Sequence, residues 1–206
     1  MSLSANYITA IQQQIKLHEA EITELDKAIG DGDHVINLQR GLSALMAISD
    51  ELATLNWPDT IKKVGMTFMS TMGGASGSLF GTLFVKMAKA SSDDMNLATF
   101  SDAFSVGVES VKQRGKADLG EKTMLDTLIP VANSLQLSAN TNLSMTKALE
   151  AVKQVAIAGM ESTKELQATK GRASFLGERA IGHIDPGART SQLMICAIAD
   201  LLLAKQ

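Results

Sequence analysis

The sequence predicts an all-α fold, and three observations support that prediction. The 206 residues include only three prolines, one tryptophan and one tyrosine, and they are rich in Ala, Leu, Met, Lys, Gln and Glu, which favours helix over strand. Apolar residues recur every three or four positions along extended stretches, which is the period of one helix face. No stretch shows the sustained apolar and polar alternation of a strand. We therefore expect a single all-α domain over residues 1–206.

The apolar period and the glycine-rich stretches between periodic segments set the expected helices, which are 4–25, 34–56, 58–72, 76–90, 97–114, 122–138, 143–165 and 187–204. The second of them shows the spacing clearly, with apolar residues at Val35, Leu38, Leu42, Leu45 and Leu52. Pro58 and Pro186 suit the first turn of a helix, whereas Pro130 is expected to kink or split the sixth helix. Short links between about eight helices predict antiparallel packing.

Charge and composition exclude several functional classes. The formal net charge is -3, and Lys and Arg are spread along the chain, so nothing indicates a nucleic-acid or anionic-membrane partner. The sequence has no run of about 18 uncharged apolar residues and no basic, apolar leader, so we expect a soluble, cytoplasmic protein. Cys196 lies in an apolar helical stretch and is expected to be a buried thiol. The three histidines lack the spacing of zinc ligands.

Glycine placement points to a site. Twelve of the sixteen glycines fall within four stretches between expected helices, at 30–32, 73–81, 115–120 and 171–187. Glycine there permits a positive φ or lets a ligand approach the backbone closely. Helix capping alone could explain any one stretch. Four of them, each with polar neighbours, indicate a common site.

The first stretch brings three carboxylates close together. Asp26, Asp31 and Asp33 lie within eight residues, and the intervening glycines allow the chain to curl so that the side chains converge. Such a cluster needs cations, and Mg²⁺ with its preference for oxygen ligands meets that need. The spacing is not that of an EF-hand. The structural alternative is a solvated Asp-Gly turn in which Asp33 caps the next helix.

The other stretches fit an anion and a flat ring. Gly73, Gly74 and Ser76 open a helix whose free N–H groups could bind an anion, although no Walker A loop is present and simple capping is the alternative. Met124 follows the third stretch and could pack against a base or belong to the core. The fourth stretch carries three arginines suited to phosphate or to surface carboxylates, Arg172, Arg179 and Arg189. Asp185 and Pro186 also suit an ordinary helix start.

Together these segments resemble the nucleotide-binding L subunit of bacterial dihydroxyacetone kinase. The resemblance covers about residues 5–204, and it is carried by "LDKAIGDGDH", "GGASGSLFG", "GKADLGEKTMLD" and "GRASFLGERAIGHIDPGA" in this order. It implies an up-and-down barrel of eight antiparallel helices that binds ADP at one end through two Mg²⁺ ions. Asp26, Asp31 and Asp33 match the metal-ligand aspartates of the family. The implied nucleotide contacts are His34, Val35, Ile36, Asn37, Ala75, Ser76, Gly115, Met124, Arg172, Asp185, Pro186 and Gly187.

The sequence departs from the family pattern directly after the aspartates. Val35 stands where the family usually has glycine, and Leu38 stands where it has methionine. A β-branched residue adds volume, so Val35 is expected to narrow the space beside the ligand.

The resemblance also implies a division of labour. This chain would carry the phosphoryl group on bound ADP or ATP, a separate K subunit would hold dihydroxyacetone on a histidine and receive the γ-phosphoryl, and a phosphohistidine-bearing M subunit of the phosphotransferase system would regenerate ATP. One alternative is a kinase subunit that uses free ATP on another small ketose. Another is a non-enzymatic, nucleotide-sensing partner. The sugar and the oligomeric state, a homodimer included, stay open.

Overall fold

The computed structural model describes residues 3–205, and their regular secondary structure is entirely helical. The described helices are α1 (Leu3–Leu17), α2 (Glu19–Ile29), α3 (His34–Ala47), α4 (Ser49–Leu52), α5 (Trp57–Thr71), α6 (Gly74–Ala90), α7 (Leu97–Gly115), α8 (Leu125–Asn140), α9 (Met145–Ser162), the 3₁₀ helix η1 (Arg172–Ala180) and α10 (Pro186–Leu203). The all-α prediction is confirmed. No described helix has the length and apolar character needed to cross a membrane.

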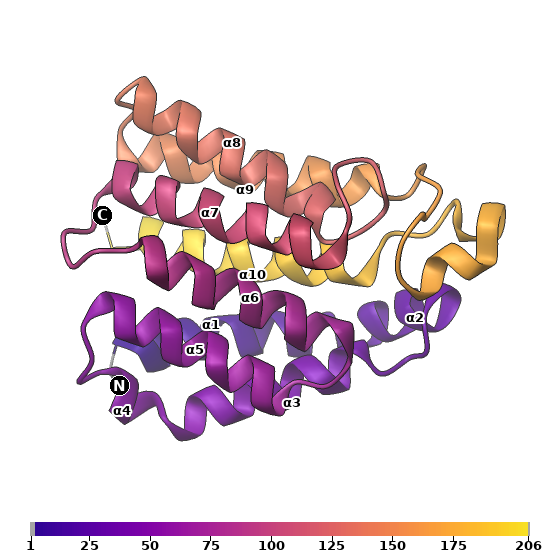
Figure 1. Cartoon of the computed structure of the whole chain (residues 1–206), viewed down its shortest axis with the longest axis horizontal. Coiled ribbons are helices and arrows are strands. Elements are labelled where there is room, and N and C mark those ends of the chain that lie inside the picture. Colours follow the sequence, from indigo (N-terminus) through magenta and orange to yellow (C-terminus); the bar gives the residue numbers. More distant parts are fainter. Residues whose placement is uncertain (1–2, 206) are drawn as a thin grey trace.

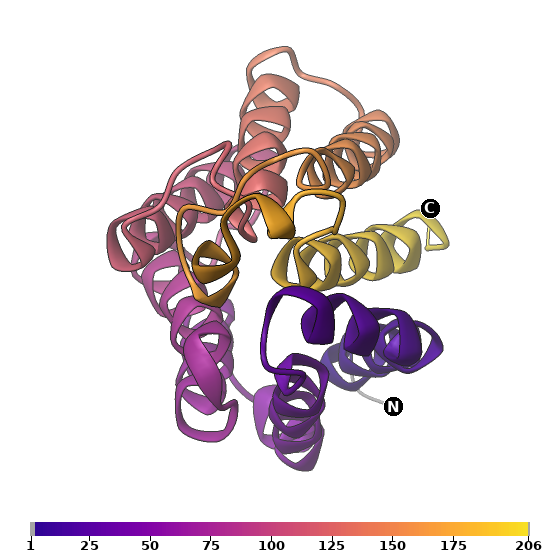
Figure 2. The same ribbon diagram turned by 90° about the vertical axis from the view of Figure 1, so that its right-hand side faces the viewer.

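Eight of these helices form a closed ring. Going round from α1, each packs on the next in the order α3, α5, α6, α7, α8, α9 and α10, and α10 packs back on α1 (Figure 2). Successive helices run in opposite directions along the ring (Figure 1). This is the up-and-down arrangement that the resemblance implied.

The antiparallel ring places every second connection at the same end. The connections α2–α3, α5–α6, α7–α8 and α9–α10 all lie at that end, which also carries α2 and η1, and we call it the site end (Figure 1). The four glycine-rich stretches lie in these connections and in the helix ends beside them. Both chain termini lie at the opposite end of the ring (Figure 1).

The first two expected helices are each interrupted. A single helix over 4–25 was wrong, because His18 has a ψ of 14° and separates α1 from α2. The second helix ends at Ala47, and a short turn, α4, follows. The apolar period continues across both breaks, since Ile22 and Leu52 are buried beyond them, and the period therefore hides the interruptions.

Pro130 does not split its helix. Helix α8 is continuous through Pro130, whose missing N–H leaves the Asp126 carbonyl without its helical donor. The α9 backbone packs on this carbonyl, because a Cβ added to Gly159 would lie 2.2 Å from the Asp126 oxygen. Close packing between two helices thus accommodates the proline.

Two apolar clusters hold the ring and its site end. The larger one fills the ring with residues from nearly all the long helices, among them Leu38, Phe80 and Val131. The smaller one joins Ile29 of α2 to alanines of the α9–α10 connection, Ala168, Ala173 and Ala180. It fixes η1 against the end of α2. Cys196 is partly buried on α10, and burial raises the pKa of its thiol.

Candidate metal centre

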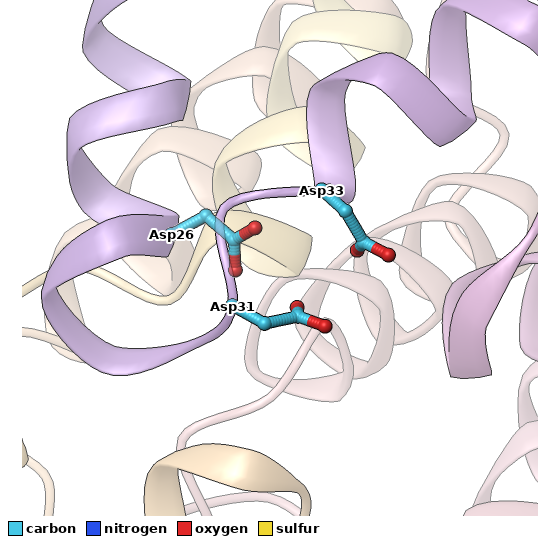
Figure 3. A group of neighbouring side chains, drawn as sticks. All are labelled: Asp26, Asp31 and Asp33. Carbon is cyan, nitrogen blue, oxygen red and sulfur yellow. The ribbon is translucent and has the colours of Figure 1, made fainter.

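The three predicted aspartates converge at the end of α2. One carboxylate oxygen from each of Asp26, Asp31 and Asp33 lies within 4.8 Å of the others (Figure 3). Asp26 is buried, whereas Asp31 and Asp33 are exposed. The turn between them requires glycine, because a Cβ on Gly30 would lie 2.0 Å from Oδ1 of Asp26 and Gly32 has a φ of +76°. We call Asp26, Asp31 and Asp33 the acidic triad.

The side chain of Asp26, rather than that of Asp33, caps the start of α3. The N–H of His34 donates to Oδ2 of Asp26 at 2.9 Å. Asp33 occupies the N-cap position, but within residues 3–205 its side chain makes no capping hydrogen bond. The structural alternative, in which Asp33 acts as a cap, is therefore not realised here.

The triad has the chemistry of a divalent-cation site. Three carboxylates this close repel one another unless a cation lies between or beside them. Opposed ligand oxygens on Mg²⁺ lie about 4 Å apart, so small side-chain rotations would bring the three oxygens into range. The guanidinium of Arg172 lies 2.7 Å from Oδ2 of Asp31 and supplies positive charge at this position. The residues present fit a hard divalent cation.

His34 joins three of the predicted segments. Its buried imidazole places Nδ1 3.1 Å from Oγ of Ser76 on α6 and Nε2 2.9 Å from Oγ1 of Thr190 on α10. The Thr190 hydroxyl donates to the Pro186 carbonyl at 3.0 Å, so it accepts from Nε2–H of His34. Burial lowers the pKa of His34, against the opposing effect of the nearby aspartates. A neutral imidazole thus connects α3, α6 and α10.

The four residues at the start of α3 have different environments. Val35 is only 2% exposed and belongs to the larger apolar cluster, as does Leu38, so their volume is accommodated in the core. Ile36 is 56% exposed. Asn37 is buried beside the α5–α6 turn, where a Cβ on Gly73 would lie 2.7 Å from its Oδ1.

The α5–α6 turn presents the start of a helix. Helix α6 begins at Gly74, which has a φ of +71°, and its N-cap Gly73 has no side chain to cover the first N–H groups. Ala75 is exposed and Ser76 is partly exposed in that first turn. These open amides and the positive end of the helix dipole suit an anion.

The third and fourth glycine-rich stretches meet at Met124. A Cβ on Gly187 would lie 3.5 Å from Cβ of Met124 and 3.0 Å from Oδ2 of Asp185. Met124 is largely buried, so its thioether lines this contact without being exposed. Gly115 ends α7 and packs near Leu79 of α6.

Asp185 is the cap of α10, as its sequence position predicted. Its Oδ2 accepts from the N–H of Ala188 at 2.7 Å, and Pro186 follows in the first helical turn. Burial raises the pKa of Asp185 to about 7, although the Ala188 hydrogen bond and the charge of Lys122 oppose the rise.

Lys122 and Asp126 hold the α7–α8 loop through hydrogen bonds, and neither role was predicted from the sequence. Lys122 is 1% exposed with a φ of 59°, and its ammonium donates to the carbonyls of Thr163 and His183. The Asp126 carboxylate accepts from the N–H of Gly120 at 2.5 Å and of Thr123 at 2.8 Å. An aspartate three residues after a threonine at a helix start is a recognisable signal for Asp126. No such sequence signal marks Lys122, because a lysine is usually exposed and nothing in the sequence indicates that this one is buried.

The three arginines of the fourth stretch separate. Arg172 reaches the acidic triad, as described above. The Nε–H of Arg179 donates to the Leu176 carbonyl at 3.5 Å, and Arg189 pairs with Glu21 at 2.8 Å. Only Arg172 among them is therefore placed at the candidate metal centre.

Comparisons with known proteins identify the fold and the family of the chain. The fold resembles that of the crystal structure of the dihydroxyacetone kinase of C. freundii, with a TM-score of 0.75, 25% identity and 97% of this chain covered. A second structure of that kinase, in complex with AMP-PNP and Mg²⁺, matches with the same TM-score and coverage. In both cases this chain spans 34%, about a third, of the length of the kinase chain.

Two bacterial relatives match over nearly their whole length. The PEP-dependent dihydroxyacetone kinase, ADP-binding subunit DhaL, of Escherichia coli (strain K12) is 41% identical, with 100% of both chains covered. The PEP-dependent dihydroxyacetone kinase 1, ADP-binding subunit DhaL, of Listeria innocua is 42% identical, with 90% of this chain and 89% of the relative covered. The family model described as the DAK2 domain matches residues 28–200. The chain therefore belongs to the DAK2 domain family and, within it, to the DhaL-type subunits of dihydroxyacetone kinase.

Proposed function

We propose that this chain is the ADP-binding, phosphoryl-transfer subunit of a dihydroxyacetone kinase. The observation that carries the proposal is the convergence of the acidic triad, the open start of α6 and Arg172 at one end of the ring. A bound diphosphate needs cations and amide donors together, and this end offers both. The names of the E. coli and Listeria relatives support the same nucleotide.

In this proposal the triad holds two Mg²⁺ ions. When bound, such ions neutralise phosphate charge and help to align donor and acceptor. Asp26 gives the site a fixed member, because the N–H of His34 holds its carboxylate. Asp31 and Asp33 are exposed and can turn toward the nucleotide.

The remaining predicted residues would bind the nucleotide itself. The N–H groups at Ala75 and Ser76 are available to a phosphate at the start of α6. Met124 and Gly187, which pack against each other and are both buried, keep the contacts that the resemblance assigned, and the polarizable thioether of Met124 suits a flat base. The other proposed contacts keep the roles that the resemblance assigned, namely residues 34–37, Gly115, Asp185 and Pro186.

The sugar would be held by a separate K subunit in the cytoplasm. The site end exposes apolar side chains, among which Phe175 of η1 is 87% exposed. Leu119 and Ile181, from the flanking loops, are also exposed. Such a surface suits a protein partner. A phosphohistidine-bearing M subunit would recharge the ADP after each transfer.

Reconstitution tests this function. The purified chain is incubated with K subunit, dihydroxyacetone, Mg²⁺ and the phosphorylated M carrier, and dihydroxyacetone phosphate is measured. We expect product only when all components are present. Absence of product from a preparation that mass spectrometry shows to contain adenine nucleotide would exclude the three-subunit scheme.

Use of free ATP is a second candidate. The similar C. freundii kinase was crystallised with AMP-PNP, an ATP analogue, which favours this alternative. Exchange of labelled ADP separates the two schemes. Retention of bound ADP through gel filtration supports the recharged coenzyme, whereas rapid exchange and ATP-driven turnover without the M carrier support a free cosubstrate.

A further inference from the structure

The ion pair between Arg172 and Asp31 joins a surface arginine to a candidate metal ligand. One guanidinium nitrogen lies 2.7 Å from Oδ2 of Asp31, and the Arg172 side chain is 71% exposed. Asp31 is a member of the acidic triad, so a divalent cation bound there would lie beside this guanidinium, and the two positive charges would repel each other. The two positive groups therefore compete for one anion.

Arg172 lies on a segment, residues 171–182, that has glycines with positive φ at its start, in its middle and at its end. These are Gly171, Gly177 and Gly182. Within the described structure, a Cβ at any of these glycines would meet no heavy atom within 4 Å. Between them, Ala173 and Ala180 attach the segment to Ile29. The segment is thus held by a small apolar contact to α2 and by the hydrogen bond from the Gly182 N–H to the Lys164 carbonyl, and the described residues leave space around its glycines.

We propose that Arg172 is a positioning residue that occupies the place of a cation at the acidic triad until a divalent ion displaces it. The displaced guanidinium is then available to the diphosphate, whose oxygens match its planar donors. This proposal rests on the proposed function, and it adds that metal binding and the ion pair between Arg172 and Asp31 oppose each other.

The energetics favour displacement. An exposed ion pair between single charges is weak, because water and salt screen it. A divalent ion interacts with all three carboxylates at once, so its attraction to the triad is stronger than that of Arg172, which contacts one carboxylate. The arginine therefore lowers metal affinity modestly in the absence of nucleotide and raises affinity for the metal–nucleotide complex.

These opposite effects give a direct test. Bound nucleotide and metal are removed from the full chain with a chelator, and binding of Mn²⁺ alone is measured by electron paramagnetic resonance. We expect Arg172→Gln to bind Mn²⁺ about two- to fivefold more tightly than the wild type. We expect the same variant to bind ADP at fixed Mg²⁺ about tenfold more weakly, because a charged phosphate contact is lost.

Arg179→Gln is the matched control. Arg179 lies on the same segment and is exposed, but its side chain contacts the Leu176 carbonyl and not the triad. We expect its Mn²⁺ affinity to stay within about twofold of the wild type. A gain in Arg172→Gln without a gain in Arg179→Gln therefore belongs to the Arg172 contact and not to a general disturbance of the segment.

Two results overturn the inference, and they are distinguishable. If the wild type binds Mn²⁺ and ADP but Arg172→Gln binds Mn²⁺ no more tightly, the competition is wrong and the proposed function stands. If the wild type binds neither Mn²⁺ nor Mg²⁺-dependent ADP, both the inference and the proposed function are wrong.

Discussion

Nε2 of His34 lies 2.9 Å from Oγ1 of Thr190, which joins the first turn of α3 to α10 across 156 positions of the chain. The other ring nitrogen of His34 lies 3.1 Å from Oγ of Ser76 on α6. One buried imidazole thus fixes the starts of three helices relative to one another. The geometry of the site end depends on this long-range bond as much as on the loops that carry the candidate ligands.

Thr190→Val tests that bond. The substitution keeps the shape but removes the hydroxyl, so Nε2–H of His34 and the Pro186 carbonyl both lose a partner. We expect the free energy of unfolding to fall by about 1–3 kcal/mol in urea titrations. The control is Ser191→Ala, since the buried hydroxyl of Ser191 has no hydrogen-bond partner in the described part of the chain. A loss in the control as large as in Thr190→Val would contradict the assignment.

Asp31→Ala tests the metal assignment. Asp31 is exposed and pairs with Arg172 only through a surface contact, so its loss should leave the helical circular dichroism unchanged. We expect it to abolish Mg²⁺-dependent ADP binding in calorimetric titrations. Asp50→Ala, on α4 at the opposite end, serves as the control. Wild-type ADP affinity in Asp31→Ala at fixed Mg²⁺ would exclude Asp31 as a ligand.

Asp26→Ala should have a double effect. Its buried carboxylate accepts the N–H of His34, so we expect a loss of about 1 kcal/mol in stability in addition to the loss of metal-dependent binding. Urea unfolding in the absence of metal therefore distinguishes the two variants, because we expect Asp26→Ala to lose more stability than Asp31→Ala. Equal stability of the two variants would show that the His34 contact contributes nothing.

Asp185→Asn should alter the pH dependence of stability. The pKa of an aspartate in an unfolded chain is about 3.9, and in the folded chain burial raises that of Asp185 to about 7. The folded state therefore binds the proton more tightly, so the contribution of Asp185 to stability is full below about pH 4 and declines as the pH rises toward 7. Asparagine keeps the cap without this charge.

We expect urea titrations of nucleotide-free protein to give equal slopes with pH for the two proteins above about pH 7, with Asp185→Asn more stable there by about 1–3 kcal/mol. Between about pH 4 and 7 the difference between the variant and the wild type should grow steadily. A difference that does not change with pH would show that Asp185 ionises normally.

Phe175→Ser tests the proposed docking surface. Phe175 is exposed on η1 at the site end, and exposed aromatic side chains often anchor protein interfaces. In the reconstituted system we expect the KM for the K subunit to rise about tenfold, with ADP affinity unchanged. Leu137→Ser, another exposed apolar position near the end of α8, should leave the KM unchanged. An equal KM in both variants would exclude Phe175 from the interface.

The sequence predicts the helices because the apolar period reflects burial along each of them, whereas their closure into a ring was implied by the resemblance. The same period cannot show where a helix changes direction while its buried face continues. Ile22, on the far side of His18, is buried as the pattern requires, yet the chain has already turned from α1 into α2. That turn places Asp26 at the site end.

The sequence predicted those parts of the candidate site whose side chains come from one short segment of the chain. Asp26, Asp31 and Asp33 converge as their spacing indicated. The alternative in which the Asp33 side chain caps α3 was wrong, because it considers only neighbours in the chain, whereas Asp26 reaches the His34 N–H from eight residues away. Lys122 was missed for a related reason, since its partners Thr163 and His183 come from another connection.

The placement of both termini opposite the triad has a practical and an architectural consequence (Figure 1). A fusion partner, affinity handle or surface tether joined to either end leaves the candidate metal centre unobstructed. The same geometry allows this ring to be one part of a longer polypeptide, as in the C. freundii kinase, of which it spans 34%, because the covalent linkage and the reactive face do not compete for space.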